Sequence, residues 1–110
     1  MDTKPEDTKP SIEQIEKLKA ALAVWPEKTG GYTWDNCPLG FLRERAGIPM
    51  PLWLRKQNDH IKIAREEYGL PYELAKRLID NSLHFWKGPR RRSREQKAMI
   101  EAYLESIEAG

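Results

Sequence analysis

The chain has 110 residues, of which 39% are hydrophobic and 33% are charged, and its formal net charge is +2. This composition is typical of one soluble globular domain and excludes a disordered chain, and so small a net charge does not by itself indicate a polyanionic partner. No apolar run approaches the roughly 20 residues that span a bilayer and the N-terminus lacks the apolar core of a signal peptide, so we expect a cytoplasmic protein without a membrane partner.

The N-terminal residues predict a tail followed by a helix. Residues 1–10 repeat the polar tetrapeptide DTKP, which can bury nothing, so we expect a flexible tail there. Ser11 and Gln14 have the spacing of a capping box, in which the side chain of each residue hydrogen-bonds to the backbone amide of the other. Apolar residues then recur at helical spacing until Pro26, which indicates a first helix between Ser11 and Pro26.

A loop and a second helix are expected next. Residues 26–36 contain adjacent glycines and no apolar periodicity, which is typical of a loop. Pro38 suits the first position of a helix because it has no amide hydrogen to leave unpaired. This helix is expected to run to Ala46, with Gly47 in the left-handed conformation that ends helices, and a short helical turn is expected over 51–54.

The second half of the chain predicts three further helices. The first two occupy 59–68 and 71–80 and are separated by a turn that contains glycine. Ser93 and Gln96 have the spacing of a second capping box, and an apolar stripe follows along the last helix. No segment alternates with the period of two that is typical of a strand. We therefore expect an all-α fold, a compact bundle of four to five short helices that forms a single domain over 11–110.

Basic side chains accumulate in one place, at the start of the last predicted helix. Between residues 87 and 97 only Glu95 is acidic, whereas six side chains are basic. The six are Lys87, Arg90, Arg91, Arg92, Arg94 and Lys97. Positive charge at the start of a helix opposes the helix dipole, at a cost of about 0.3–1 kcal/mol for each exposed charge, so helix stability does not explain the cluster. An external anion explains it, and the alternative is a solvated helix start without a partner.

Nucleic acid is the anion that we expect these residues to bind. The planar guanidinium groups of arginine bind phosphate oxygens in pairs. The aromatic residues His84, Phe85 and Trp86 lie immediately upstream and could stack on unpaired bases. Tryptophan in so small a domain is nevertheless expected to be mostly buried, and this applies to Trp86 as well as to Trp25, Trp34 and Trp53. Trp86, which directly precedes the cluster, is nevertheless included among the candidate binding residues.

Two other binding modes are open. A protein-interaction module, such as a phage or host regulatory or inhibitory factor, would place the same basic residues on an acidic protein surface. A helix-turn-helix over residues 59–80 has suitable helix lengths, but acidic and basic side chains cancel on its second helix, whereas a helix that reads the major groove carries few carboxylates. Composition does not separate a nucleic-acid partner from a protein partner.

A catalytic role would depend on Cys37, the only cysteine of the chain. A thiol at the start of a helix can have a lowered pKa, and His60 or His84 could serve as its base. The alternative, which we favour, is a small buried side chain packed close to Gly40. The sequence contains no metal-ligand spacing and no phosphate-binding glycine loop, so we expect a binding protein rather than an enzyme, with no metal and no cofactor.

The segment CPLGFL at 37–42, the later Asn81 and the helix after Arg91-Arg92-Ser93 resemble a pattern in small uncharacterised bacterial and phage proteins. Those proteins have a C-x-L-G helix start, a later asparagine and a terminal helix. The resemblance implies a bacterial or phage cytoplasmic origin, and it implies no activity and no site residue.

Overall fold

The computed structural model describes residues 9–29, 37–49 and 57–109. Within these ranges the chain forms five α-helices and one short 3₁₀ helix, and it forms no strand. The helices are α1 (Ile12–Ala23), α2 (Pro38–Arg45), α3 (Gln57–Tyr68), α4 (Tyr72–Ser82), the 3₁₀ helix η2 (Phe85–Lys87) and α5 (Pro89–Ala109). The prediction of an all-α fold is confirmed, and the turn expected over 51–54 lies outside the described residues.

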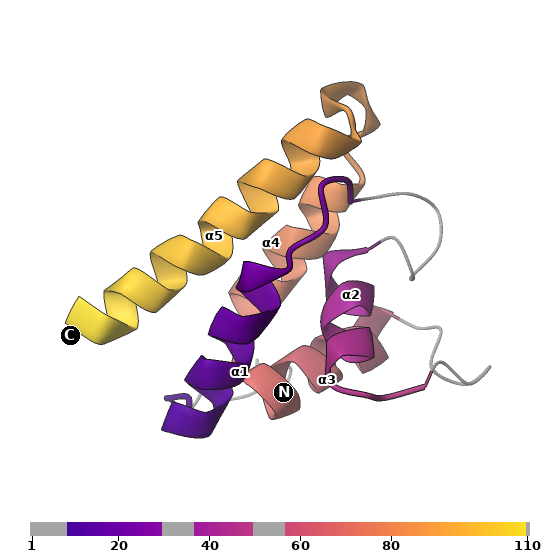
Figure 1. Cartoon of the computed structure of the whole chain (residues 1–110). Coiled ribbons are helices and arrows are strands. Elements are labelled where there is room, and N and C mark those ends of the chain that lie inside the picture. Colours follow the sequence, from indigo (N-terminus) through magenta and orange to yellow (C-terminus); the bar gives the residue numbers. More distant parts are fainter. Residues whose placement is uncertain (1–8, 30–36, 50–56, 110) are drawn as a thin grey trace, which may run out of the picture.

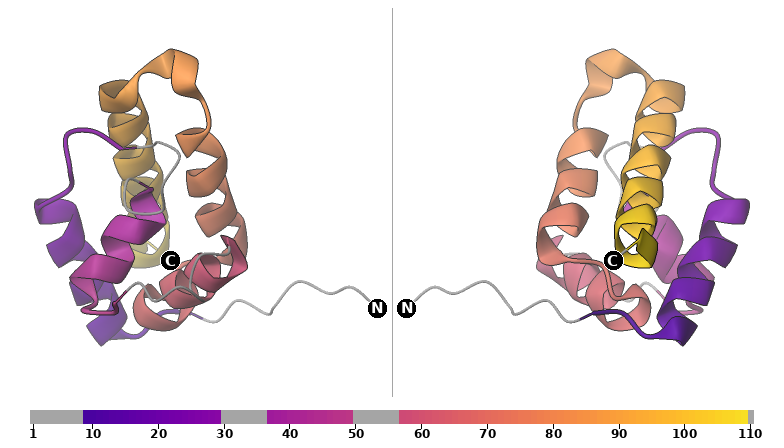
Figure 2. Two further views of the ribbon diagram at one scale, coloured as in Figure 1. Left: turned by 90° about the vertical axis from the view of Figure 1, so that its right-hand side faces the viewer. Right: turned by 90° about the vertical axis from the view of Figure 1, so that its left-hand side faces the viewer.

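The helices pack around α4, which contacts α2, α3 and α5. The longest helix, α5, lies alongside α4, and α1 packs against α3 on another side of the bundle (Figures 1 and 2). Leu42 of α2, Leu78 of α4 and Ile100 of α5 belong to the core and are fully buried. Each such side chain stabilises the fold by about 1.5–3 kcal/mol relative to an exposed one. η2 and the start of α5 lie together at one end of the molecule (Figure 1).

Local sequence sets the ends of the first two helices. The Ser11 hydroxyl accepts a hydrogen bond from the Gln14 amide at 3.1 Å, and the Gln14 side-chain oxygen accepts one from the Ser11 amide at 2.9 Å, so the predicted capping box is confirmed. Pro38 is the first residue of α2, as predicted. Ala46 caps α2, which ends one residue earlier than expected, and Gly47 follows with a φ of 76°.

The start of α5 differs from the prediction. The helix begins at Pro89, directly after Gly88 with its φ of 79°, and therefore about one turn before the capping box expected at Ser93 and Gln96. Gly88 turns the chain into the helix, and proline at the first helical position leaves no amide unpaired. Ser93 and Gln96 lie within the helix rather than at its start, and their side chains are buried, so the prediction of a second capping box is wrong.

The residues before α1 pack onto the turn between α3 and α4. Pro10 is buried, and a Cβ atom added to Gly69 would lie 2.5 Å from the Cβ of Pro10. Gly69 has a φ of 70°, and the Tyr103 hydroxyl of α5 donates to its carbonyl oxygen at 3.0 Å. Pro10 therefore belongs to the packed domain, whereas positions 1–8 of the expected tail lie outside the described residues.

Replacing Gly69 with alanine is expected to destabilise the fold more than the same change at Gly47. Both glycines have a positive φ, which costs an L-residue about 1–2 kcal/mol. At Gly69 the new methyl group also meets Pro10, whereas nothing lies within 4 Å of a Cβ atom at Gly47. Urea denaturation of both variants measures the difference in the free energy of unfolding, and equal losses would contradict the contact with Pro10.

Candidate functional site

The six basic side chains expected to bind an external anion divide into three groups. Arg92 is the first, and it is buried with only 5% of its surface exposed. Its Nε donates to the Thr29 carbonyl oxygen at 3.2 Å, and its Nη1 donates to the His84 carbonyl oxygen at 3.1 Å. The structure contradicts the expectation that Arg92 binds an external anion together with the other five residues, because its guanidinium bonds to backbone carbonyls inside the protein.

Lys87 and Arg91 form the second group, because a carboxylate offsets their charge. The Lys87 amine lies 2.8 Å from Glu95 Oε1, and Arg91 Nε lies 3.1 Å from Glu95 Oε2. The Asn81 side-chain amide also donates to Glu95 Oε1, at 2.9 Å. The hydrogen bond from Lys87, followed by those from Asn81 and Arg91, lowers the pKa of Glu95 from its usual 4.5 to about 2. Glu95 is therefore ionised at neutral pH and holds both cations.

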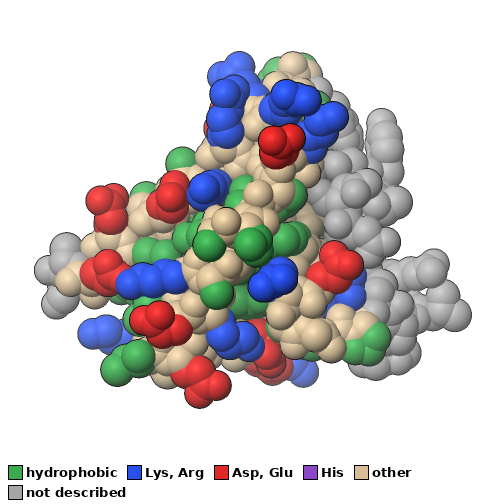
Figure 3. All heavy atoms as spheres, viewed as in Figure 1, with side chains coloured by type: hydrophobic (Ala, Val, Ile, Leu, Met, Phe, Trp, Pro, Cys, Tyr) green, Lys and Arg blue, Asp and Glu red, His purple; other side chains and the backbone are tan. Residues whose placement is uncertain are grey.

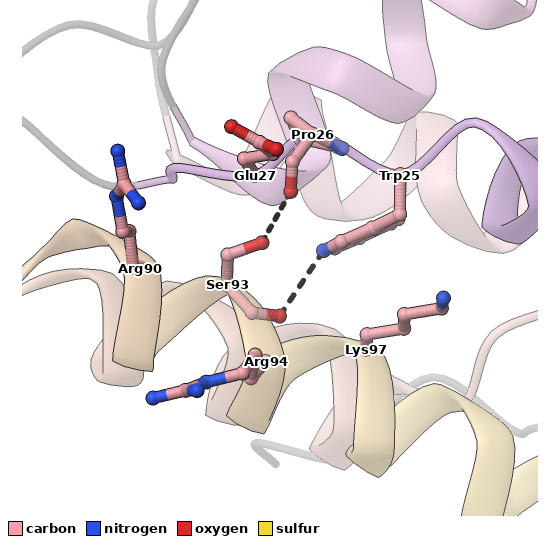
Figure 4. Close-up of a pocket in the computed structure, with 7 residues that line it drawn as sticks. All are labelled: Trp25, Pro26, Glu27, Arg90, Ser93, Arg94 and Lys97. Carbon is pink, nitrogen blue, oxygen red and sulfur yellow. Dashed lines mark hydrogen bonds between the residues drawn. The ribbon is translucent and has the colours of Figure 1, made fainter.

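Arg90, Arg94 and Lys97 form the third group, and we call these three residues the basic face. Their spacing of four and then three residues places them on one stripe of α5 over about 10 Å. None of the three forms an ion pair with another residue in the described parts of the chain. They line a pocket of about 290 Å³ between α5 and the segment that follows α1 (Figure 4).

The segment after α1 forms the other wall of the pocket. Trp25, Pro26 and Glu27 line it, and Trp25 Nε1 donates to the Ser93 carbonyl oxygen at 3.1 Å. The Ser93 hydroxyl donates in turn to the Pro26 carbonyl oxygen (Figure 4). The Trp25 ring also packs edge-to-face against Phe41 of α2, with ring centroids 5.2 Å apart. These contacts fix the position of the wall relative to the basic face.

A buried polar network joins α4 to α5 beside the pocket. The Gln96 side-chain amide donates to Asn81 Oδ1 at 3.0 Å and to Ser82 Oγ at 3.2 Å, and the Thr29 hydroxyl donates to Gln96 Oε1. Buried polar groups are stable only when their hydrogen bonds are made, so the network fixes the rotation of α5 and with it the direction of the basic face. The partners lie 14 to 67 residues apart in the chain, and no local sequence signal marks them.

Trp86 is exposed, with 76% of its surface accessible, so the expectation that it is mostly buried is wrong. It lies in η2, which has three residues and sits at the end of the bundle, outside the core (Figure 1). Its indole stacks on the His84 ring, with centroids 4.6 Å apart and planes inclined by 24°. Trp25 packs partly against the core, and Trp34 and Trp53 lie outside the described residues.

The charges on α5 are ordered along its length. Lys and Arg side chains gather at the end of the molecule where the helix begins, with an acidic side chain among them (Figure 3). The second half of the helix exposes Glu101, Glu105 and Glu108. This order is the reverse of the one that the helix dipole favours, since the dipole stabilises negative charge at the start of a helix and positive charge at its end.

Cys37 does not have the surroundings of a nucleophile. Only 5% of its surface is exposed, and burial raises the pKa of its thiol. The amides of Leu39 and Gly40 at the start of α2 act in the opposite direction, but their effect is smaller. A reactive cysteine requires an accessible thiolate, so the geometry gives no support to the catalytic alternative.

The candidate helix-turn-helix consists of α3 and α4, which pack against each other. The exposed face of α4 carries charges of both signs, from Glu73, Lys76, Arg77 and Asp80. Carboxylates on a reading helix repel phosphates, so α4 lacks the electrostatic character of a helix that enters the major groove.

No helix in the described part of the chain has the length and apolar composition needed to cross a membrane. Comparisons with protein-family models, with curated proteins and with solved structures found no match. The resemblance to small bacterial and phage proteins therefore stays a prediction, and the geometry of the site is the basis for a functional proposal.

Arg92→Ala is expected to lower the free energy of unfolding by about 1.5–3 kcal/mol or more, the usual contribution of a hydrogen bond to a charged group. The variant leaves the carbonyl oxygens of Thr29 and His84 without this donor. Arg91→Ala is the matched control, because it removes an exposed arginine one position away and is expected to change stability by less than about 1 kcal/mol. Thermal or urea unfolding compares the two, and a neutral Arg92→Ala would contradict the structural role.

Glu95→Gln is expected to reduce the loss of stability in acid. Because the folded-state pKa of Glu95 lies at about 2, below its usual 4.5, its contribution is complete above pH 4.5 and is lost as the pH falls towards 2. Unfolding curves of the wild type and the variant across this pH range measure the effect. Glu101→Gln, in an exposed glutamate of the same helix, is the control, and an unchanged pH dependence in Glu95→Gln would count against the pairing with Lys87.

Proposed function

We propose that the protein binds nucleic acid through the basic face formed by Arg90, Arg94 and Lys97. The observation that carries the proposal is their arrangement: three cations on one stripe of α5, without ion-pair partners among the residues described, line a single pocket. Lys87 and Arg91 are not included in the basic face, because Glu95 partly offsets their charge.

Phosphate groups match the basic face in charge and chemistry. Three basic side chains and one acidic side chain, Glu27, line the described wall of the pocket, so positive charge is in excess. Guanidinium groups bind phosphate oxygens through two parallel hydrogen bonds, and the lysine amine adds a compact positive charge. The unpaired amides at the start of α5 place the positive end of the helix dipole near the same surface.

A bound polyanion would also relieve an unfavourable feature of α5. The first turn contains the exposed arginines Arg90 and Arg91 and no acidic residue, and each exposed charge there costs about 0.3–1 kcal/mol at low salt. Phosphates beside these side chains offset that repulsion. The exposed glutamates in the second half of α5 repel phosphates, so we expect contact only with the first half of the helix, which includes Lys97.

An acidic protein surface is the second candidate partner. Trp86 and Leu83 are 76% and 54% exposed and lie close in the chain to the arginines. Tryptophan and arginine are the residues that most often dominate the free energy of binding at protein interfaces. We prefer nucleic acid because the three cations repeat along about 10 Å of one helix, as phosphates repeat along a strand.

The triple variant Arg90→Ala/Arg94→Ala/Lys97→Ala is expected to weaken binding to mixed-sequence DNA and to flatten its salt dependence. Loss of three phosphate contacts reduces the slope of log K against log salt concentration by about 2.7 on a duplex and about 2.1 on a single strand. Fluorescence anisotropy with labelled DNA between about 50 and about 200 mM salt measures both quantities.

The matched control replaces Lys62, Lys76 and Arg77, three exposed basic residues of α3 and α4, with alanine. Both triple variants lose the same charge, so only a specific surface separates them. Equal losses of affinity would show that net charge, and not the basic face, is responsible. No binding of DNA or RNA by the wild type at about 150 mM salt would refute the proposal and favour the acidic protein partner.

A further inference from the structure

We infer that the nucleic acid is single-stranded, and that one of its unpaired bases stacks on Trp86 while neighbouring phosphates lie on the basic face. This inference rests on the proposed function and specifies the class of strand. Two observations carry it: the open face of the Trp86 indole, and the rigid attachment of η2 to the start of α5.

The Trp86 indole has the geometry of a stacking surface. The His84 ring covers one face at a centroid distance of 4.6 Å, and an exposed fraction of 76% leaves the opposite face open to solvent. A tryptophan in this position forgoes burial of most of its large apolar surface, so its contribution to the fold does not explain it. The stack with His84 also favours one orientation of the ring, which reduces the entropy lost when a base docks.

The aromatic surface is attached rigidly to α5. The His84 carbonyl oxygen accepts hydrogen bonds from Arg92 Nη1 at 3.1 Å and from the Lys87 amide at 3.0 Å. On the other side of Trp86, the Lys87 amine lies 2.8 Å from Glu95 Oε1. Trp86 therefore lies between two residues that are each bonded to α5, and its position relative to the basic face is fixed.

The separation of the two features suits a short single strand. Trp86 and Arg90 are four residues apart, so their Cα atoms lie within about 15 Å of each other. Because this is the limit for an extended chain, a stacked strand at ~3.4 Å per nucleotide covers the distance with at most about four nucleotides. Contact sites of about four nucleotides and more are typical of proteins that combine aromatic stacking with a basic groove.

A duplex cannot use both features at once. Each base within a duplex is already stacked on both faces, whereas an unpaired base can be turned out onto an aromatic side chain. Stacking on an indole discriminates weakly between bases, so we expect little sequence preference. DNA and RNA single strands share this chemistry.

Trp86→Ala is the decisive variant. We expect it to weaken binding of an oligothymidylate of about 12 nucleotides by about 5- to 140-fold, which is a stacking contribution of about 1–3 kcal/mol converted at 1.4 kcal/mol per tenfold. Affinity for a duplex of the same length is expected to stay unchanged, as is the salt slope, because no phosphate contact is removed. An oligouridylate is expected to show the same dependence on Trp86.

Two further variants keep the test specific. Leu83→Ala removes a neighbouring exposed apolar side chain, 54% accessible, and is expected to leave affinity unchanged. Trp86→Phe retains an aromatic face and is expected to recover part of the affinity lost in Trp86→Ala. Circular dichroism melting curves of all three variants are expected to match the wild type, because both side chains lie outside the core.

The outcomes separate this inference from the proposed function. Single-strand affinity that is insensitive to Trp86→Ala, or equal affinity for duplex and single strand, overturns the inference. If the basic-face triple variant still loses affinity in that case, the proposed function survives alone. If the wild type binds neither form of nucleic acid, both proposals fail together.

Discussion

The buried guanidinium of Arg92 joins the three segments from which the candidate site is built. Arg92 belongs to α5, and it donates to Thr29 in the segment after α1 and to His84 just before η2. A buried charge is tolerated only when its donors find acceptors, so the three segments must be in place together. The pocket, the basic face and the exposed indole therefore have a common anchor.

Helical geometry explains why neighbouring arginines have different roles. Successive residues of an α-helix are about 100° apart around the axis, so Arg90, Arg91 and Arg92 point in three directions. Arg90 lines the pocket, Arg91 reaches Glu95, and Arg92 enters the interior. Arg94 follows one turn after Arg90 on the same side of the helix, and this repetition produces the basic face, although the ends of the side chains diverge (Figure 4). Three successive arginines therefore have three roles: Arg92 is a buried anchor, Arg91 forms an internal ion pair, and Arg90 lines the pocket.

The fold was largely predictable because its signals are local. Capping residues, prolines and glycines within a few positions of each helix end set α1 and α2, and apolar spacing identified the faces that pack. The site was predictable only in its location. The burial of Arg92 depends on the carbonyl oxygen of Thr29, which lies 63 residues away in the chain, and on that of His84, which follows α4. Ser93 and Gln96 also could not be placed from local sequence. Their spacing matches a helix cap, but both residues lie within α5, where their side chains are buried and hydrogen-bond to Pro26 and Asn81, which are distant in the chain.

The reversed order of charges on α5 weakens this segment as an isolated helix, since isolated helices depend on favourable end charges. Its helical form depends instead on the packing of Ile100 and Leu104 in the core. The basic face therefore exists only once the bundle has assembled, and the same residues in an extended chain do not share one side. Transplanting the stretch 85–97 onto another polypeptide would carry over its charge but not its shape.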